Sequence, residues 1–240
     1  MKHQNPQFAT THWTVVWKAA EEDSQHGRPA LAEVVRRYWQ PLYAFARRRG
    51  LSCEDAEDAT QEFLSNVVNG NLLASADPAR GKFRSYLLTA WKRFLIDQFR
   101  KQDASVRGGD VKLESLDLSA GEQHWRELSS RDPDPDKTFN LSWATSLLDE
   151  ARRRIRDEYE AKGKTPLVEA LLPRLTHSLD SADYAQLSAD LDMSPGAIKV
   201  AMHRLRQRYG SALREVVIET VEDSGDVDAE LNEMLRVLSQ

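Results

Sequence analysis

The chain has 240 residues, enough for one or two domains, and 30% of them are charged, with a formal net charge of −5. Because the chain as a whole is acidic, binding to nucleic acid would have to rest on local clusters of cations. No apolar run approaches the roughly 20 residues of a membrane-spanning helix, and the first residues lack a signal-peptide core. Cys53 is the only cysteine. Since it has no partner for an internal disulfide, we expect a reducing, cytoplasmic location without membrane insertion.

The first part of the chain has the periodicity of amphipathic helices. A long pattern over residues 28–49 contains Pro41, which we expect to kink the helix or split it in two. Ser52 is placed to cap the next helix, residues 53–68. Beyond its first turn this helix carries a polar ridge that includes Asp58, Gln61 and Glu62. The helix dipole is a weak explanation for polar residues so far along, and the ridge favours docking on a basic partner helix.

A basic helix is predicted over residues 83–101. Its opening rings, Phe83 and Tyr86, alternate with cations, which suits stacking on unpaired bases and contact with phosphates. Core packing is an equal alternative for these two rings. For Trp91 and Phe99 core packing is the expected role.

Helical periodicity is lost between residues 103 and 136, where Gly, Ser and Pro gather, and this predicts a linker. The helical pattern resumes at Phe139 and continues in a further helix over residues 166–175. Strand-like alternation is scarce throughout, so we expect an almost entirely helical protein.

The clearest motif of the second part is a pair of helices within residues 181–214. Ser194 is a good N-cap, and Pro195 suits the first position of the second helix. That helix has one apolar stripe and no acid from Pro195 to Arg214, and its other faces carry Lys199, His203, Arg204, Arg206 and Arg208. This is the helix-turn-helix pattern, whose second helix lies in the major groove of DNA. The alternative is a solvated basic face on an ordinary helical hairpin.

The residues after Arg214 form an acidic tail, which we expect to end in a helix with Leu231, Met234, Leu235 and Leu238 on one side. Such a tail packs within the chain, receives a partner or shields the basic helix from non-specific DNA. The sequence does not separate these three alternatives.

Motifs of catalytic and metal sites fail on inspection. Gly81-Lys82 is not a P-loop, because Phe83 stands where Ser or Thr must follow. The aspartates of residues 132–136 lack the glycine and the closing glutamate of a calcium loop. The histidines and Cys53 have no metal-ligand spacing. We therefore expect no enzyme activity, no catalytic residues, no metal and no cofactor.

Three segments resemble conserved regions of bacterial sigma factors. EDAEDATQEFL, residues 54–64, looks like the polymerase-binding helix of region 2, and GKFRSYLLTAWKRFLIDQFRK, residues 81–101, is similar to the promoter-melting and −10-reading segment that follows it. MSPGAIKVAMHRLRQRY, residues 193–209, resembles the recognition helix of region 4, which reads the −35 element. Two regions joined by a linker is the layout of the extracytoplasmic-function (ECF) group of the sigma-70 family.

The resemblance implies an all-α fold of two helical domains joined by a flexible linker. The expected parts are a region 2-like domain, a linker, a region 4-like helix-turn-helix domain and an acidic tail, at residues 1–104, 105–138, 139–221 and 222–240. The implied function is that of a sigma factor, which binds core RNA polymerase and directs promoter recognition and transcription initiation.

The resemblance also implies roles by position. The residues expected at the clamp helices of the polymerase's largest subunit are Glu57, Asp58, Gln61 and Glu62. Those expected to melt the duplex or lie along the −10 DNA are Phe83, Arg84, Tyr86, Leu87, Lys92, Arg93 and Arg100. Those expected at the −35 element are Lys199, His203, Arg204, Arg206 and Arg208. Further implied partners are the polymerase flap and an anti-sigma factor or other regulator.

Two alternatives belong to other classes. An autonomous helix-turn-helix regulator that binds operators as a dimer would explain residues 181–214 but leave the ridge on residues 53–68 without a role. An adaptor whose basic helices meet acidic protein partners would need no DNA at all.

Overall fold

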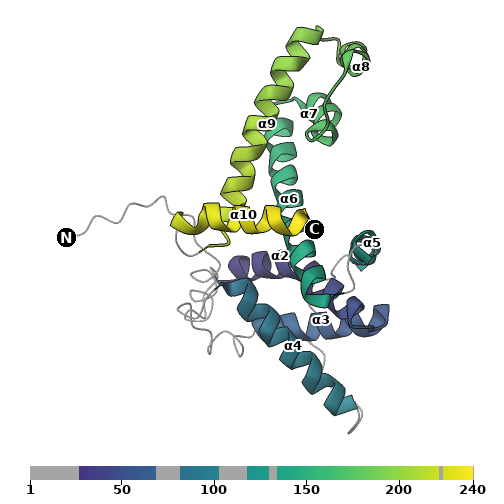
Figure 1. Ribbon diagram of the computed structural model, residues 1–240, viewed down its shortest axis with the longest axis vertical. Coiled ribbons are helices and arrows are strands. Elements are labelled where there is room, and N and C mark those ends of the chain that lie inside the picture. Colours follow the sequence, from purple (N-terminus) through teal and green to yellow (C-terminus); the bar gives the residue numbers. More distant parts are fainter. Residues whose placement is uncertain (1–26, 69–81, 103–117, 130–133, 222–223, 240) are drawn as a thin grey trace, which may run out of the picture. The chain divides into compact units, whose positions relative to one another are not determined.

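The structure, a computed structural model, describes residues 27–68, 82–102, 118–129, 134–221 and 224–239 (Figure 1). These ranges contain helices and no strand, which confirms the predicted all-α fold. The helices are α2 (Gly27–Arg48), α3 (Cys53–Val68), α4 (Phe83–Gln102), α5 (Leu118–Ser129), α6 (Pro135–Ala161), α7 (Thr165–Leu171), η3 (Leu172–Arg174), α8 (Ser181–Leu191), α9 (Pro195–Ile218), η4 (Ser224–Asp226) and α10 (Val227–Leu238). None of the helices in this described part is long and apolar enough to cross a membrane.

The chain divides into two compact units. Unit 1 consists of Met1–Ser146 and Ile218–Gln240, and unit 2 consists of Leu147–Val217. The predicted domains placed a linker at 105–138 and a separate tail at 222–240. In the structure a helix forms inside the first of these segments, and the second belongs to unit 1.

Helix α2 is the centre of unit 1 and runs without a break through Pro41, so of the two expected effects, a kink or a split, the split is absent. Pro41 removes one backbone donor, but residues around it are buried, among them Tyr38, Leu42 and Phe45, and α2 packs on α3 and α5. Their burial outweighs the local cost of the proline, because tertiary packing supplies most of the stability of a helix in a protein.

Helices α3 and α4 pack through a cluster of rings. Trp91 is fully buried, and its ring centroid lies 4.9 Å from that of Phe63 and 5.6 Å from that of Phe94. Leu95 is the last buried residue of α4 among its described side chains, and Phe99 is 43% exposed. The expected core role of Trp91 is confirmed, and that of Phe99 is wrong, since Phe99 lies beyond this last buried residue.

Helix α5 forms within the segment expected to be linker, because it has a face to bury on α2. Gly121 lies under the ring of Trp39, where an added Cβ would meet the Cζ3 atom at 2.7 Å. The absence of a side chain at Gly121 therefore lets the two helices approach closely. Leu128, on the same helix, is also buried.

Unit 2 contains the helix-turn-helix. Asp180 caps α8 with a reciprocal pair of hydrogen bonds to Asp183, and the helix ends at Asp192 in the left-handed conformation (φ 49°). Ser194 Oγ accepts from Ala197 N at 3.2 Å, as expected of an N-cap, and Pro195 begins α9. The predicted stripe of α9 is confirmed at Ile198, Met202 and Leu205, which are buried.

Helix α10 confirms a helical end of the acidic tail, and it confirms the predicted face only in part, at Met234. Its buried residues are Val227, Glu230 and Met234, whereas Leu235 is 57% exposed. The helix is rotated away from the leucine stripe because the carboxylate of Glu230 is paired with cations of unit 1.

We expect Gly121→Ala to destabilise the protein, because the overpacking of Trp39, about 1–3 kcal/mol, exceeds the roughly 1 kcal/mol that alanine gains over glycine in a helix. Gly210→Ala is the control, since a Cβ at that position of α9 meets nothing within 4 Å. Thermal unfolding followed by circular dichroism should show a lower melting temperature for Gly121→Ala and an equal or higher one for Gly210→Ala. A stabilised Gly121→Ala would contradict this account of the α2–α5 contact.

Candidate nucleic-acid interface

The acidic ridge on α3 lies on the side opposite its buried stripe. Asp58 and Glu62 are exposed, while Glu57 and Gln61 are half-buried and joined by a hydrogen bond of 3.2 Å from Gln61 Nε2 to Glu57 Oε1. Partial burial, together with the carboxylates of Asp58 and Glu54, raises the pKa of Glu57. The predicted ridge residues therefore share one solvent-facing surface, where their negative charges repel one another and favour a cationic partner.

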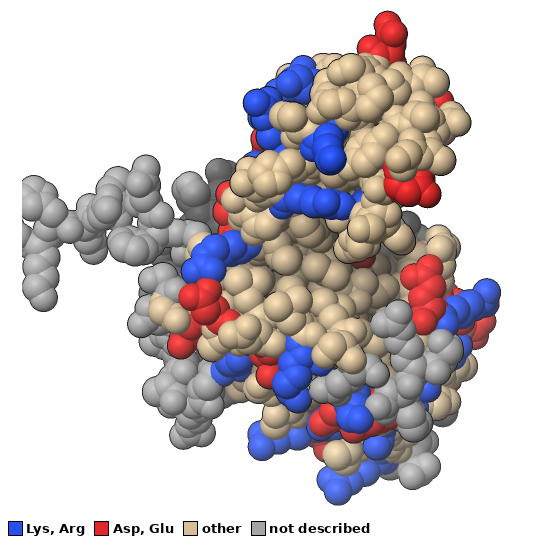
Figure 2. Space-filling view, turned by 45° about the horizontal axis from the view of Figure 1, so that its top comes forward, with Lys and Arg blue, Asp and Glu red and all other residues tan. Residues whose placement is uncertain are grey.

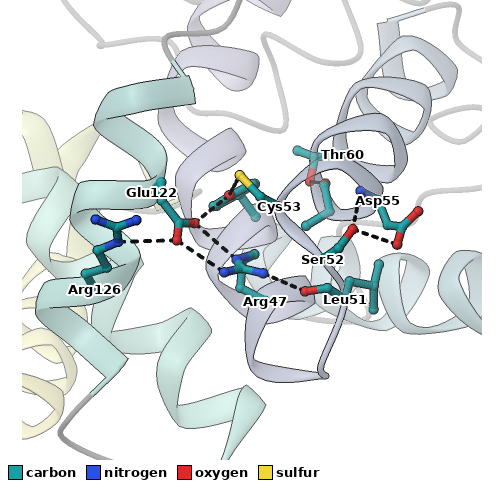
Figure 3. A network of polar contacts seen from close by, with 10 residues as sticks. Arg47, Leu51, Ser52, Cys53, Asp55, Thr60, Glu122 and Arg126 are labelled. Carbon is teal, nitrogen blue, oxygen red and sulfur yellow. Dashed lines mark hydrogen bonds and ion pairs between the residues drawn. The ribbon is translucent and has the colours of Figure 1, made fainter.

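A polar network holds the end of α2 in place next to α3 (Figure 3). Arg47 donates to both carboxylate oxygens of Glu122 at 3.1 Å and to the carbonyl oxygen of Leu51 at 2.7 Å. Tyr43 donates its hydroxyl proton to Glu122 Oε2 at 2.8 Å, and Arg126 adds an ion pair at 3.4 Å. The bidentate contact between Arg47 and Glu122 fixes α5 to α2 more firmly than a single charge pair would.

This network shifts two pKa values. Partial burial works against the charged form of Glu122, but hydrogen bonds from Tyr43 and Arg47 hold the pKa of that carboxyl below its usual value. Burial, the contact with the Cys53 thiol and the bond to Glu122 raise the pKa of Tyr43. Sequence reasoning missed this network, because Glu122 lies in the segment that was expected to be linker.

The turn from α2 to α3 is closed by Ser52. Asp55 N donates to Ser52 Oγ at 3.0 Å, and Ser52 Oγ donates to Asp55 Oδ2 at 2.7 Å, as Figure 3 shows. The predicted cap is therefore present. It sets the start of α3, and with it the direction in which the ridge faces.

The start of α4 is buried in unit 1. Phe83 is 1% exposed and packs edge-to-face on Tyr38, with ring centroids 5.6 Å apart, and Leu87 is fully buried. Tyr86 is half-buried. The side chains of Phe83 and Leu87 are thus not open to DNA in this conformation, and their predicted contacts with DNA stay predictions that require this part of α4 to move.

Arg84 is also buried, which is unusual for a residue expected at DNA. Its guanidinium lies 3.7 Å from the ring centroid of Trp143 and donates to Asn140 Oδ1 at 3.0 Å. Its second terminal nitrogen lies 3.5 Å from Glu230 Oε1. Lys82, beside it, is paired with the other oxygen of Glu230.

The remaining cations of α4 differ in their exposure and in their ion pairs. Lys92 Nζ is 2.5 Å from Asp136 Oδ2 and therefore has an acidic partner on α6. Arg93 is exposed, and Arg100 is exposed with a loose ion pair of 3.8 Å to Asp97. Phe99 lies on this exposed part of the helix, so the outer end of α4 offers both cations and a ring.

The predicted cations of α9 fall into two groups. Lys199, His203 and Arg204 are exposed and make no side-chain hydrogen bond or ion pair to the described residues. Val200 lies among them and is 51% exposed. This face is therefore open, with free donors and one apolar side chain.

Arg206 and Arg208 are engaged within unit 2. Arg206 donates to the carbonyl oxygens of Leu175 and His177 at 3.0 and 2.8 Å. Arg208 donates to Glu158 at 2.7 Å and to Glu215 at 3.1 Å. Both side chains stabilise the fold around the helix-turn-helix, and their predicted contacts with phosphates stay predictions.

The cations of the described residues do not form one continuous surface on the face that Figure 2 shows. On the face shown in Figure 2, Lys and Arg side chains lie in small separate groups, with Asp and Glu between several of them. Among the described residues there is no group of three or more His, Cys, Asp and Glu that could hold a metal ion. The surface therefore suits several local contacts better than one strong electrostatic attraction.

Comparisons with known proteins agree with these features. The family model for sigma-70 region 2 matches residues 34–105, which contain the ridge and α4. The chain is 23% identical over 227 residues to the ECF RNA polymerase sigma factor SigE of Mycolicibacterium smegmatis, an alignment that covers 91% of this chain and 77% of that protein. No solved structure matches. The chain is thus similar to sigma-70 region 2 over residues 34–105 and to an ECF sigma factor over most of its length.

We expect the α2–α5 contact to weaken in acid. The folded pKa of Glu122 lies below the unfolded value of about 4.3, so its stabilisation is fully present above that pH and is lost as the pH falls through the folded pKa. Glu122→Gln should cost about 1 kcal/mol at pH 7 and progressively less below pH 4, since the carboxylate is partly solvated.

Denaturation of the two proteins at several pH values measures this difference. Glu127→Gln is the control, because Glu127 is an exposed carboxylate on the same helix that accepts a hydrogen bond from Gln123, a residue of its own helix. If the difference in unfolding free energy between Glu122→Gln and the parent protein did not change with pH, the charge of Glu122 would not contribute to the α2–α5 contact.

Proposed function

We propose that the ridge Glu57, Asp58, Gln61 and Glu62 docks this sigma factor on core RNA polymerase, while α4 and α9 address the −10 and −35 elements of one promoter. The observation that carries the proposal is the pairing, in one chain, of an exposed acidic surface on α3 with exposed cations on two other helices. In this proposal the chain binds core polymerase and promoter DNA and directs transcription initiation, which the match to sigma-70 region 2 and the likeness to an ECF sigma factor support. The contact with the clamp helices of the largest subunit, the contact with the flap and control by an anti-sigma factor are the finer parts of the proposal.

Attachment to polymerase explains how so few free cations suffice. Neutralisation of phosphates supplies most of the affinity of proteins for DNA, so the separate groups of cations in this chain predict weak binding by the free protein. On the polymerase both DNA-binding helices are held at a fixed spacing. The second contact is then intramolecular, and two weak contacts act together.

At the −10 element, the residues best placed to act first are Arg93, Arg100 and the half-buried Tyr86. Arg93 and Arg100 are exposed on the outer part of α4, where they can lie along phosphates. Unstacking a base step costs a few kcal/mol, and this cost is offset when the base stacks on an aromatic ring. Phe99 is exposed on the same part of α4 and offers such a ring.

At the −35 element, Lys199, His203 and Arg204 are the proposed base-facing residues, since their donors are unused within the described part of unit 2. Val200 is suited to apolar contact with a thymine methyl group. A polymerase-bound sigma factor works where the polymerase does, so a cytoplasmic location is part of the proposal. The class of protein is not enzymatic, and the polymerase carries out the chemistry.

Transcription by purified core polymerase tests the proposal as a whole. Addition of the chain should start transcripts at specific promoters. An autonomous regulator would instead bind an operator as a dimer and protect two half-sites about one helical turn apart without core enzyme.

We expect Asp58→Ala with Gln61→Ala to weaken binding to core polymerase by at least about tenfold, because truncation of one side of an interfacial charge pair leaves its partner without a counter-charge. Affinity is measured by titration of labelled core enzyme. Glu54→Ala is the control, since Glu54 is an exposed acid of the same helix that lies outside the ridge. Undiminished binding of the double variant would remove the ridge from the interface.

We expect Arg204→Ala to lose roughly 1–3 kcal/mol on promoter DNA if the guanidinium contacts a base. The measurement compares holoenzyme affinity for a duplex that contains the −35 element with that for a scrambled duplex. An equal loss on both would make Arg204 a phosphate contact. No loss on either would exclude Arg204 from the interface.

A further inference from the structure

Helix α10 is held in unit 1 by a buried carboxylate. Val227 and Met234 supply apolar contact, and Glu230, between them on the helix, is 2% exposed. A buried carboxylate is costly unless it is paired. The pairing is provided by Lys82 and Arg84, the residues on either side of Phe83 at the start of α4.

The surroundings of Arg84 form an anion site, which we call the Arg84 cluster. It consists of Lys82, Arg84, Asn140, Trp143 and Glu230. Trp143 lies against the guanidinium and Asn140 orients it, so that its position is fixed before any anion arrives. The Nε atom of Arg84 is buried and has no hydrogen-bond partner in the described structure. The carboxylate of Glu230 therefore leaves one donor of the cluster unused, which would be available to an anion with more oxygens that takes the place of Glu230.

The anion site lies in the segment that the proposed function assigns to promoter melting. Lys82 is the accessible member of the pair, with 48% of its side chain exposed. A phosphate group has the charge and the additional oxygen atoms that the two cations and the free Nε–H can use. Glu230 and a DNA phosphate would thus compete for the same donors.

A second ion pair fastens the chain before α10. Arg37 of α2, whose side chain is 3% exposed, contacts Glu219 at 3.0 Å. Glu219 follows the end of α9, so the segment that leads to α10 is itself tied to unit 1. The docking of α10 is therefore prepared by its tether and does not depend on Glu230 alone.

We propose that α10 is a built-in competitor of DNA, whose Glu230 carboxylate occupies the Lys82–Arg84 pair in the free protein and gives it up to a DNA phosphate in the polymerase–promoter complex. This inference rests on the proposed function for its occupant, DNA. It assigns the acidic tail a target in unit 1, at the start of α4, and it makes weak DNA binding by the free chain a regulated property.

Affinity of the free full-length chain for a fluorescent single strand and for a duplex, measured by anisotropy at several salt concentrations, tests the proposal. Glu230→Gln should bind about threefold to tenfold more tightly at low salt, with a salt dependence steeper by about one phosphate contact. Asp226→Asn is the matched control, because it removes one negative charge from an exposed residue directly before α10 whose side chain makes no capping hydrogen bond. Adding Lys82→Gln to Glu230→Gln should abolish the gain.

Equal affinities of Glu230→Gln and Asp226→Asn would reduce the effect to net charge. No gain in either variant would leave α10 with a structural role alone. Circular dichroism of each variant establishes that it is folded. If Glu230→Gln does not fold, hydrogen exchange in the parent protein decides the matter. Amides of residues 227–238 should exchange faster in the polymerase–promoter complex than in the free chain, and unchanged protection would overturn the proposal.

Binding of the parent protein to core polymerase, measured separately, tests the proposed function independently of these results. Failure there, with a gain for Glu230→Gln on DNA, would keep the competition and discard the sigma-factor interface. Normal polymerase binding, without a gain in DNA affinity for Glu230→Gln, would keep the sigma-factor interface and discard the competition.

Discussion

The organisation of unit 1 depends on how a buried positive charge is balanced. Arg84 is 7% exposed, and a guanidinium in such a place is tolerated only with hydrogen bonds and a counter-charge. Asn140 and Trp143 of α6 meet part of this need, and Glu230 of α10 supplies the charge. The demand of one arginine thus brings three segments, distant in sequence, to a common point. It also explains why the last residues of the chain belong to unit 1.

A similar principle attaches α5. Arg47 and Tyr43 of α2 direct donors toward Glu122, and Gly121 leaves space for the ring of Trp39. A segment with little helical periodicity in its surroundings becomes ordered where it can satisfy polar groups and bury a ring at once. The acidic ridge of α3 follows from this support, because the end of α2 and the Ser52 cap fix where α3 starts.

Sequence periodicity was sufficient for most helices and for the side of α3 and α9 that faces solvent. Ser52, Ser194 and Pro195 mark helix starts through local chemistry, which a sequence displays directly. Sequence periodicity was insufficient where contacts with residues distant in sequence decide whether a helix continues or a side chain is buried. Burial of the residues around Pro41 keeps α2 continuous. Phe99, in contrast, has the spacing of a core residue on α4 but is exposed.

The same limit applies to the candidate site. Lys199, His203 and Arg204 were predicted as exposed cations and are exposed, because no distant group is needed to place them. Arg206 and Arg208 carry the same charge but are bonded to carbonyl and carboxylate oxygens from other elements of unit 2. A cationic residue in a sequence shows no sign of such a partner, and neither does the burial of Arg84 against α10.

The division into two units has an optical consequence. Tryptophans occur at positions 13, 17, 39, 91, 125 and 143, and all of these precede Leu147, where unit 2 begins. Tryptophan fluorescence of the native chain therefore reports on unit 1 alone, whereas far-ultraviolet circular dichroism reports on the helices of both units. Following the two signals side by side distinguishes melting of one unit from melting of the other, without any label.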